Sequence, residues 1–456
     1  MGNSQLNVVI LAAGKGTRMY SDLPKVLHLM AGRPLLAHVI DCAEQLAADR
    51  IVVVYGFGGE QVREAIDKPE IRWAKQEQQL GTGHAVQQAM PLLEDDGITL
   101  VMLGDVPLLD ADTGRKLLAE AEGKLALLTV IKDDPTGYGR IMRAQDGHVS
   151  AIVEEKDASA TARAVREVNS GIMAMPTTLL RKWLGRLDNR NAQGEFYLTD
   201  VIAMAVADGI SVVTKTTVDE WEVAGINSKQ DLAAVEREWQ RRNAEKLMRA
   251  GVTLCDPARI DVRGELQTGR DVEIDVGCIF EGDVRIEDGV KVGAYCVIRN
   301  AVIGADTNIA PFSHIDGATI GENARIGPYA RLRPGSALMA ETHIGNFVEI
   351  KNSRVDVGSK INHLSYVGDS TVGKQVNIGA GTITCNYDGV NKHRTVIGDR
   401  AFIGSDTQLV APVTVEAGAT IGAGSTITRD APAETLTLSR SKQVTVAGWK
   451  RPEKKK

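Results

Sequence analysis

The chain has 456 residues, 43% of them hydrophobic and 25% charged, and carries a formal net charge of −6 at pH 7. This length predicts two or more domains, and the acidic balance argues against nucleic acid as a partner. The sequence contains no apolar run of about 18 residues and no signal-peptide pattern, so we expect neither a membrane span nor export. The five cysteines are odd in number and lack C-x-x-C spacing, which predicts reduced thiols in a cytoplasm rather than disulfides or a zinc site.

The first strong motif occupies residues 8–19 and reads V-V-I-L-A-A-G-K-G-T-R-M. Its leading apolar residues predict a buried strand, and the small residues that follow allow backbone N–H groups to approach phosphates. Arg18 and Lys25 add positive charge beside this loop. The glycine spacing differs from that of the P-loop, and Met19 occupies the position where the dinucleotide fingerprint needs Gly or Ala. The motif therefore predicts a phosphate-binding loop of another class.

Strand-like runs alternate with helical patterns in the first half of the chain. Residues 51–55 and 99–103 predict strands, and residues 35–46 and 83–93 show helical spacing. This alternation predicts a doubly wound α/β domain with a mostly parallel sheet, whose ligands bind beyond the carboxyl ends of the strands. Asp105 comes directly after one such strand, so it is placed to hold Mg²⁺, which takes few protein ligands. An isolated aspartate there would more often form a turn, but the neighbouring phosphate loop favours the metal.

The stretch L-A-A-G-K-G-T-R-M followed by L-P-K, from residue 11 to residue 25, resembles the signature of sugar-nucleotide pyrophosphorylases. Further segments resemble, in the same order, those of the bacterial family of bifunctional N-acetylglucosamine-1-phosphate uridylyltransferases. These segments are Gln76, L-G-T-G-H at 80–84, P-T-G-Y-G-R at 135–140, V-E at 153–154, V-N-S-G at 168–171, G-E-F-Y at 194–197 and E-V-A-G-I-N at 222–227. Their shared order makes chance matches implausible.

The resemblance implies a reaction in which a sugar-1-phosphate oxygen attacks the α-phosphorus of UTP and pyrophosphate leaves. It implies that N-acetylglucosamine-1-phosphate is the acceptor, that Asp105 and Asn227 hold Mg²⁺, and that Arg18 and Lys25 are catalytic groups on the phosphates. The residues implied to bind UTP and the UDP-sugar are Leu11, Ala12, Ala13, Gly14, Lys25, Gln76, Gly81, Thr82, Leu103, Gly104, Asp105, Gly139, Glu154, Asn169 and Asn227.

Residues 229–250 are polar with a narrow apolar stripe at helical spacing, and Gly251 follows as a helix stop. This pattern predicts a helical linker. We therefore divide the chain into a pyrophosphorylase domain at 1–228, the linker at 229–250 and a second domain at 251–456.

The second domain has apolar residues every six positions, as in Ile274, Phe280, Ile286, Val292 and Ile298. The register slips several times and continues to Ile427. A six-residue period fits neither a helix nor a simple strand, and it predicts a parallel β-helix in which the apolar residue of each repeat points inward. The pattern resembles the left-handed hexapeptide acyltransferases.

Two segments of this domain resemble the acetyltransferase half of the same bifunctional family, N-H-L-S-Y at 362–366 and T-C-N-Y-D-G at 384–389. The resemblance implies a homotrimer that transfers acetyl from acetyl-CoA, bound between neighbouring prisms, to the amine of glucosamine-1-phosphate. It implies that His363 is the base, a role that imidazole suits near neutral pH, although a solenoid histidine alone would more often be a solvated bystander.

The remaining implied contacts in this domain form two groups. Those to the acceptor sugar phosphate are Arg333, Lys351, Tyr366, Asn377, Asn386, Tyr387 and Lys392. Those to acetyl-CoA are Ala380, Ser405, Ala423 and Arg440.

Two alternatives remain open at this point. ADP-glucose pyrophosphorylases also join a pyrophosphorylase to a β-helix, but there the β-helix is allosteric and structural; the segments at 362–366 and 384–389 favour the bifunctional family. A non-catalytic scaffold is the other alternative. The presence of Arg18, Lys25, Asp105, Asn227 and His363 argues against it.

Overall fold

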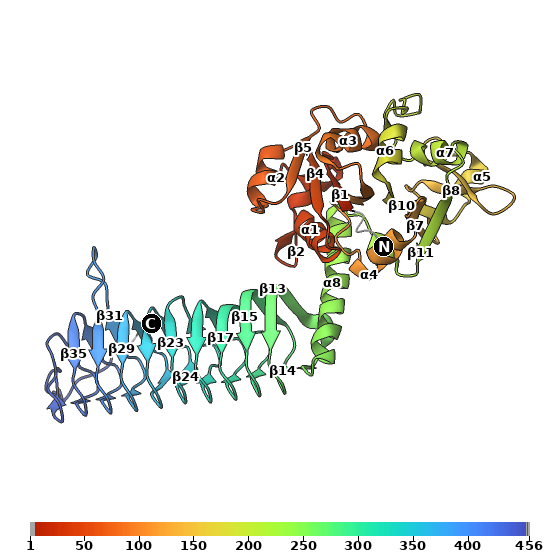
Figure 1. The fold of residues 1–456 in the computed structure, drawn as a ribbon. Coiled ribbons are helices and arrows are strands. Elements are labelled where there is room, and N and C mark those ends of the chain that lie inside the picture. The colour runs from red at the N-terminus through yellow and green to blue at the C-terminus, as the bar shows by residue number, and fades with distance from the viewer. Residues whose placement is uncertain (1–4, 453, 455–456) are drawn as a thin grey trace. The chain divides into compact units, whose positions relative to one another are not determined.

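The computed structural model of the chain describes residues 5–452 and 454. The chain forms two compact units, of which the first ends at Trp239 and the second begins at Gln240. The first contains helices around a mixed sheet, and the second is a stack of short parallel strands (Figure 1). Among the residues described, no helix has the length and apolar character needed to cross a membrane.

The first unit is built on a nine-stranded sheet of order β11-β7-β10-β6-β1-β4-β5, with β8 and β9 attached beside β10. β1 runs parallel to β4 and β6, and β7 runs parallel to β11, whereas β10 is antiparallel to both β6 and β7. The strands are β1 Gln5–Ala12, β4 Arg50–Tyr55, β5 Arg72–Lys75, β6 Gly97–Leu103, β7 Leu125–Ile131, β8 Arg140–Arg143, β9 Val149–Val153, β10 Glu167–Pro176 and β11 Val212–Thr217. A separate pair consists of β2 Leu29–Met30 and β3 Arg33–Pro34.

Helices cover both faces of this sheet. Val8 and Ile10 of β1 pack in one cluster with Leu36, whereas Val9 packs in a second cluster with Val86, because successive side chains of a strand point to opposite faces. The first cluster includes residues of α1 and α4, and the second includes residues of α3, α6 and α7. The prediction of a doubly wound α/β domain is confirmed. The helices are α1 Leu35–Gln45, α2 Gly59–Ala65, α3 Thr82–Ala89, α4 Ala111–Ala119, α5 Ala160–Arg163, α6 Thr177–Leu184 and α7 Asp200–Ala207.

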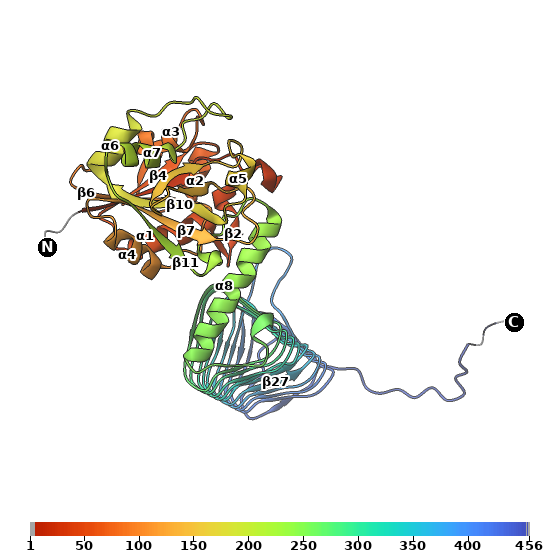
Figure 2. The ribbon, with the colours of Figure 1, turned by 90° about the vertical axis from the view of Figure 1, so that its right-hand side faces the viewer.

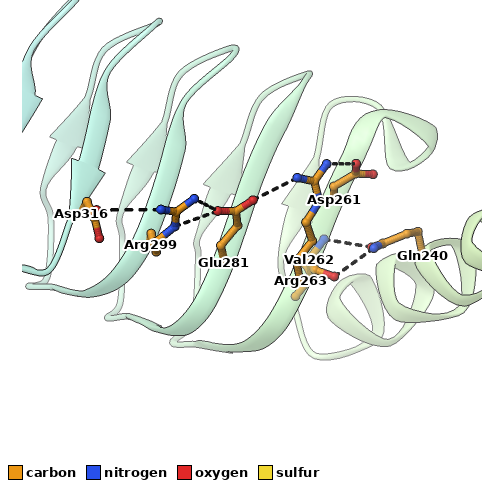
Figure 3. A network of polar contacts seen from close by, with 7 residues as sticks. All are labelled: Gln240, Asp261, Val262, Arg263, Glu281, Arg299 and Asp316. Atoms are coloured by element: carbon orange, nitrogen blue, oxygen red, sulfur yellow. Dashed lines mark hydrogen bonds and ion pairs between the residues drawn. The ribbon is translucent and has the colours of Figure 1, made fainter. Parts of the chain in front are cut away.

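The predicted helical linker is the single helix α8, Lys229–Arg249. Val235 and Trp239, in its first half, pack with Met30 in a core cluster of the first unit. In its second half, Gln240 is buried and belongs to the second unit. Its side-chain amide donates to the carbonyl of Val262 and accepts from the Val262 N–H, both over 2.9 Å, as Figure 3 shows.

The second unit is a parallel β-helix with three flat faces, seen nearly end-on in Figure 2. Face one is the stack β12 Thr253–Leu254, β14 Glu273–Ile274, β16 Lys291–Val292, β18 Asn308–Ile309, β21 Arg325–Ile326, β24 His343–Asn346, β27 Lys360–His363, β30 Asn377–Ile378, β33 Phe402–Ile403, β36 Thr420–Ile421 and β38 Leu436–Thr437.

The other two faces begin with three long strands, each of which bends from face two into face three. These strands are β13 Ile260–Thr268, β15 Cys278–Ile286 and β17 Val297–Ile303. Face two continues as β19 His314–Asp316, β22 Arg331–Leu332, β25 Glu349–Lys351, β28 Tyr366–Gly368, β31 Ile383–Cys385, β34 Gln408–Val410 and β37 Thr426–Ile427. Face three continues as β20 Ala318–Ile320, β23 Ser336–Leu338, β26 Arg354–Val355, β29 Ser370–Val372, β32 Thr395–Ile397 and β35 Val413–Val415.

Columns of apolar side chains, one from each coil, fill the interior of the β-helix. On face two Ile298, Ile315, Leu332 and Ile350 are in register, and each is at most 1% exposed. The inward direction of the six-residue repeat is confirmed.

Ile315→Ala is expected to destabilise the β-helix by about 2–5 kcal/mol, because it leaves a cavity that rigid neighbouring coils cannot close. The matched control is Val302→Ala, since Val302 is 39% exposed on the outside of face three. Chemical denaturation measures the free energy of unfolding of both variants. Equal midpoints for the two variants would contradict the assignment of Ile315 to the core.

Candidate active sites

The phosphate loop predicted after the first strand lies at the carboxyl ends of β1 and β6. Gly16 has a φ of 59°, and a Cβ there would lie 2.6 Å from Cβ of Lys25, so only glycine lets the loop fold against this lysine. The Gly104 N–H donates to the Leu11 carbonyl over 2.9 Å. This bond ties the ends of the two strands together and places Asp105 beside the loop.

Two cavities of about 340 and 410 Å³ occupy this edge of the sheet, and both are lined by Leu11, Thr82, Leu103 and Asp105. The predicted residues that line only the smaller cavity are Ala12, Ala13, Gly14, Lys25, Gln76 and Gly81. Those that line only the larger one are Arg18, Gly139, Glu154, Asn169 and Asn227. The structure thus brings the predicted nucleotide-binding residues to one edge, with Gly104 between Leu103 and Asp105.

Lys25, Asp105 and Asn227 form a compact cluster at this edge. The Lys25 ammonium pairs with the Asp105 carboxylate and donates to Oδ1 of Asn227 over 3.1 Å. A carboxylate oxygen and an amide oxygen therefore already converge on one cation. Hard oxygen donors of this kind suit Mg²⁺. The described residues contain no group of three or more His, Cys, Asp or Glu side chains able to hold a metal, so an ion here would take its other ligands from substrate phosphates and water.

Two polar side chains that line the cavities, Gln76 and Glu154, are held by hydrogen bonds. Gln76 is only 3% exposed and donates from Nε2 to the Gly81 carbonyl over 3.1 Å. Oε1 of Glu154 accepts a hydrogen bond from the Thr199 hydroxyl over 2.9 Å. Burial raises the pKa of Glu154, while this hydrogen bond opposes the rise. These hydrogen bonds hold both side chains in position to contact a ligand.

In the β-helix, His363 belongs to a column of residues along the edge between faces one and two. Ile361, Ile378, Ile403 and Ile421 are in register. The residues two positions later are therefore also in register, namely His363, Ala380, Ser405 and Ala423. At the far end Arg440 donates from Nη1 to the Ala423 carbonyl over 2.7 Å. The predicted base and all four predicted acetyl-CoA residues thus lie along one strip.

Face two carries a ladder of alternating charges that Figure 3 shows. Arg263 and Arg299 both bond Glu281, over 2.9 and 2.8 Å, and Arg299 lies 3.9 Å from Asp316. The alternation ends in the next two coils, where Arg333 and then Lys351 take the same position.

The cations beyond the end of this ladder crowd one another. A close approach of the Lys392 side chain lowers the pKa of Lys351, with burial and Arg333 adding to the effect. The positive charge of Arg333 is partly balanced by the Glu349 carboxylate, which lies 2.8 Å from the guanidinium. In the coil that follows Lys351, Gly368 occupies the same position of face two. A Cβ at Gly368 would lie 2.3 Å from the Tyr366 hydroxyl, so this hydroxyl occupies the space of the missing side chain. Two cations of face two, Lys392 of the loop between β31 and β32, and a tyrosine hydroxyl therefore form one cluster, which is a suitable place for a phosphate.

Residues 386–394, between β31 and β32, project from the coils (Figure 1). Tyr387 is 61% exposed at this loop, whereas Asn386 at its base is only 7% exposed and donates from Nδ2 to the Asp369 carboxylate. Burial would raise the pKa of Asp369, but hydrogen bonds from Asn352 and Asn386 lower it. Asn377 differs from the other predicted sugar contacts, because it begins β30 on face one.

Comparison with known proteins assigns both units. The MobA-like NTP transferase domain matches residues 8–193, the GMPPB C-terminal domain matches residues 262–344, and the bacterial transferase hexapeptide repeats match residues 394–429. The chain is 66% identical to the bifunctional protein GlmU of Methylobacillus flagellatus, over 99% of this chain and 98% of that protein. It is 62% identical to GlmU of an Azoarcus species and 61% identical to GlmU of Cupriavidus pinatubonensis, again over 99% of this chain and at least 99% of each relative.

The chain belongs to the GlmU family. This membership confirms the resemblance inferred from the sequence motifs. It also decides between the alternatives left open there, because the GlmU relatives match across both units and are bifunctional by name.

The structure adds residues that our sequence analysis of this GlmU-family chain missed. Oδ2 of Asp231 accepts from the backbone N–H groups of Asn227 and Ser228, over 3.0 and 2.8 Å, and the Ser228 hydroxyl accepts from the Asp231 N–H over 3.1 Å. This reciprocal cap fixes the backbone of Asn227 at the start of α8. The serine-to-aspartate spacing, S-K-Q-D, was a sufficient signal. Thr199, the partner of Glu154, had no such signal.

Proposed function

We propose that residues 1–228 carry uridylyl transfer, that residues 251–456 carry acetyl transfer, and that the two sites work independently. As a member of the GlmU family the chain is a bifunctional transferase of UDP-N-acetylglucosamine synthesis. It acetylates glucosamine-1-phosphate with acetyl-CoA and couples the resulting N-acetylglucosamine-1-phosphate to UMP from UTP. The observation that carries the assignment of acetyl transfer is the strip from His363 to Arg440, together with the cluster of Arg333, Lys351 and Lys392.

In uridylyl transfer the protein aligns two phosphates and neutralises their charge. A phosphate oxygen of the sugar-1-phosphate attacks the α-phosphorus of UTP, the bond to the β-phosphate breaks, and pyrophosphate leaves. Gln76 and Glu154 orient the ends of the substrates, and Arg18 and Lys25 balance charge on the phosphates. Asp105 and Asn227 would hold Mg²⁺, which supplies further charge neutralisation on the phosphate oxygens. Lys25 donates to oxygens of both residues, so its ammonium lies where it can also balance charge on the phosphates.

In acetyl transfer the strip positions acetyl-CoA along the edge of the β-helix. Adjacent coils are about 4.8 Å apart, so His363 and Ala423 are separated by roughly 14 Å, with Arg440 at the far end to meet a phosphate of the cofactor. The amine of glucosamine-1-phosphate attacks the acetyl carbonyl carbon, and the carbon–sulfur bond breaks. His363 takes the amine proton, which ends on the coenzyme A sulfur. Arg333, Lys351 and Lys392 hold the sugar phosphate.

We also propose that the chain acts as a homotrimer in the cytoplasm. The predicted sugar contacts divide between two faces of the β-helix, since Asn377 lies on face one and Lys351 on face two. A site between neighbouring prisms can use both faces. The five cysteines are all free thiols, as a reducing compartment requires.

The two half-reactions measured separately on the purified chain test this proposal. We expect pyrophosphate release from UTP and N-acetylglucosamine-1-phosphate to stop in EDTA and to return with Mg²⁺. We expect thiol release from acetyl-CoA and glucosamine-1-phosphate to continue in EDTA. Uridylyl transfer that continues in EDTA would contradict the proposed role of Mg²⁺. Absent thiol release would reduce the β-helix to a structural role.

A further inference from the structure

His363 has a side-chain partner on the neighbouring coil that the predicted mechanism does not use. Asn346, the last residue of β24, is in register with His363, the last residue of β27. Its Oδ1 lies 2.8 Å from Nδ1 of the imidazole. An amide oxygen can only accept a hydrogen bond, so this contact requires the hydrogen to be on Nδ1. The other ring nitrogen, Nε2, is then the basic one.

The backbone around this pair is fixed on both strands. The Leu364 N–H donates to the Asn346 carbonyl over 3.1 Å, and the Ser365 hydroxyl donates to the His363 carbonyl over 2.8 Å. Between the strands, a Cβ at Gly345 would lie 2.0 Å from the Asn362 carbonyl oxygen. The absence of a side chain at Gly345 therefore permits the close approach of the coils that brings Asn346 to His363.

We propose that Asn346 is a positioning residue for acetyl transfer, which holds His363 in the tautomer and orientation that present Nε2 to the substrate amine. The inference rests on the proposed role of His363 as the base. Asn346 makes no contact with the reacting atoms in this account and acts only through the imidazole.

The charged groups on the strands around His363 lie away from the imidazole contact. β24 and β30 pair with β27 on either side. Their titratable side chains, with that of β27 itself, are His343 and Lys360, which begin β24 and β27 at the opposite ends from Asn346 and His363. β30, Asn377–Ile378, has none. A carboxylate introduced at position 346 would therefore be the charged group in direct contact with the ring.

Two variants separate a positioning role from a packing role. Asn346→Leu keeps the branched shape of the side chain but removes the acceptor, and we expect kcat of acetyl transfer to fall about 10- to 100-fold, a part of the 10²–10⁴ that general base catalysis provides. KM for both substrates should stay within twofold. Asn346→Asp keeps the acceptor and adds a charge, so it should retain most of kcat at high pH while the acidic limb of the pH profile moves up by about one unit.

Two controls keep the outcomes distinct. Asn308→Leu and Asn308→Asp change an exposed asparagine on β18 of the same face, and they should leave kcat and the pH profile unchanged. The midpoint of chemical denaturation reports that the β-helix of each variant has folded. Full activity of Asn346→Leu, or an unmoved acidic limb in Asn346→Asp, would overturn the inference alone. Full acetyl transfer by His363→Ala would instead overturn the proposed function on which the inference rests.

Discussion

Asp105→Ala is expected to lower uridylyl transfer by about 10²–10³, the usual value of one preorganised electrostatic group at developing charge. The expected loss follows from the position of the carboxylate, which is 17% exposed at the edge of the sheet and already pairs with the Lys25 ammonium. Without it, Asn227 keeps a single neutral oxygen for the metal and Lys25 loses its counter-charge. Pyrophosphate release at saturating UTP and Mg²⁺ measures the effect.

Asp110→Ala is the matched control for this variant. Asp110 follows the same strand but caps α4, where its side chain accepts from the Asp112 N–H over 2.7 Å. Its loss should cost about 1 kcal/mol of stability and leave turnover intact. An Asp105→Ala enzyme with more than a tenth of normal uridylyl transfer would contradict the metal-holding role. Acetyl transfer should be unchanged in both variants.

His363→Ala is expected to lower acetyl transfer by about 10²–10⁴, the contribution of a positioned general base, and to leave uridylyl transfer unchanged. The reason is local, because His363 is exposed at the edge of the β-helix and its ring contacts Asn346 rather than the core. Loss of the ring should therefore not disturb folding. Thiol release from acetyl-CoA measures the effect.

His314→Ala provides the control for a generic solenoid histidine, since His314 also points outward, at the start of β19. It should retain both activities. Equal losses in the two histidine variants would indicate a general disturbance of the β-helix instead of a base at position 363. Loss of uridylyl transfer in a folded His363→Ala enzyme would contradict independent sites.

Local patterns in the sequence predicted most of the fold. The six-residue period identified the inward side of the coils from Ile274 to Ile427, because burial in a β-helix depends only on position within the repeat. The strand before Ala12 and the strand before Gly104 were evident from apolar runs, and their shared edge followed from parallel topology. These features need no knowledge of distant contacts.

The contacts that assemble the sites depend on register between coils and between distant segments. Asn346 and His363 are 17 residues apart, one fewer than three full repeats, because the register slips between them. His363 lies two residues after the inward Ile361, and Asn346 likewise lies two residues after the inward Ile344. The six-residue repeat predicts both positions, but it does not predict that the two residues are in register on neighbouring coils. Lys25 meets Asp105 and Asn227 across 80 and 202 residues, which no local spacing encodes.

We propose that one chain carries two independent sites linked by a diffusing intermediate. Mixing the Asp105→Ala and His363→Ala variants with acetyl-CoA, glucosamine-1-phosphate, UTP and Mg²⁺ tests it most directly. We expect each variant alone to form UDP-N-acetylglucosamine at least about 100-fold more slowly than the unaltered chain. We expect the mixture to restore its formation, because the first variant still makes N-acetylglucosamine-1-phosphate and the second still uses it. A mixture that forms no product, although each variant keeps its remaining half-reaction, would contradict the claim.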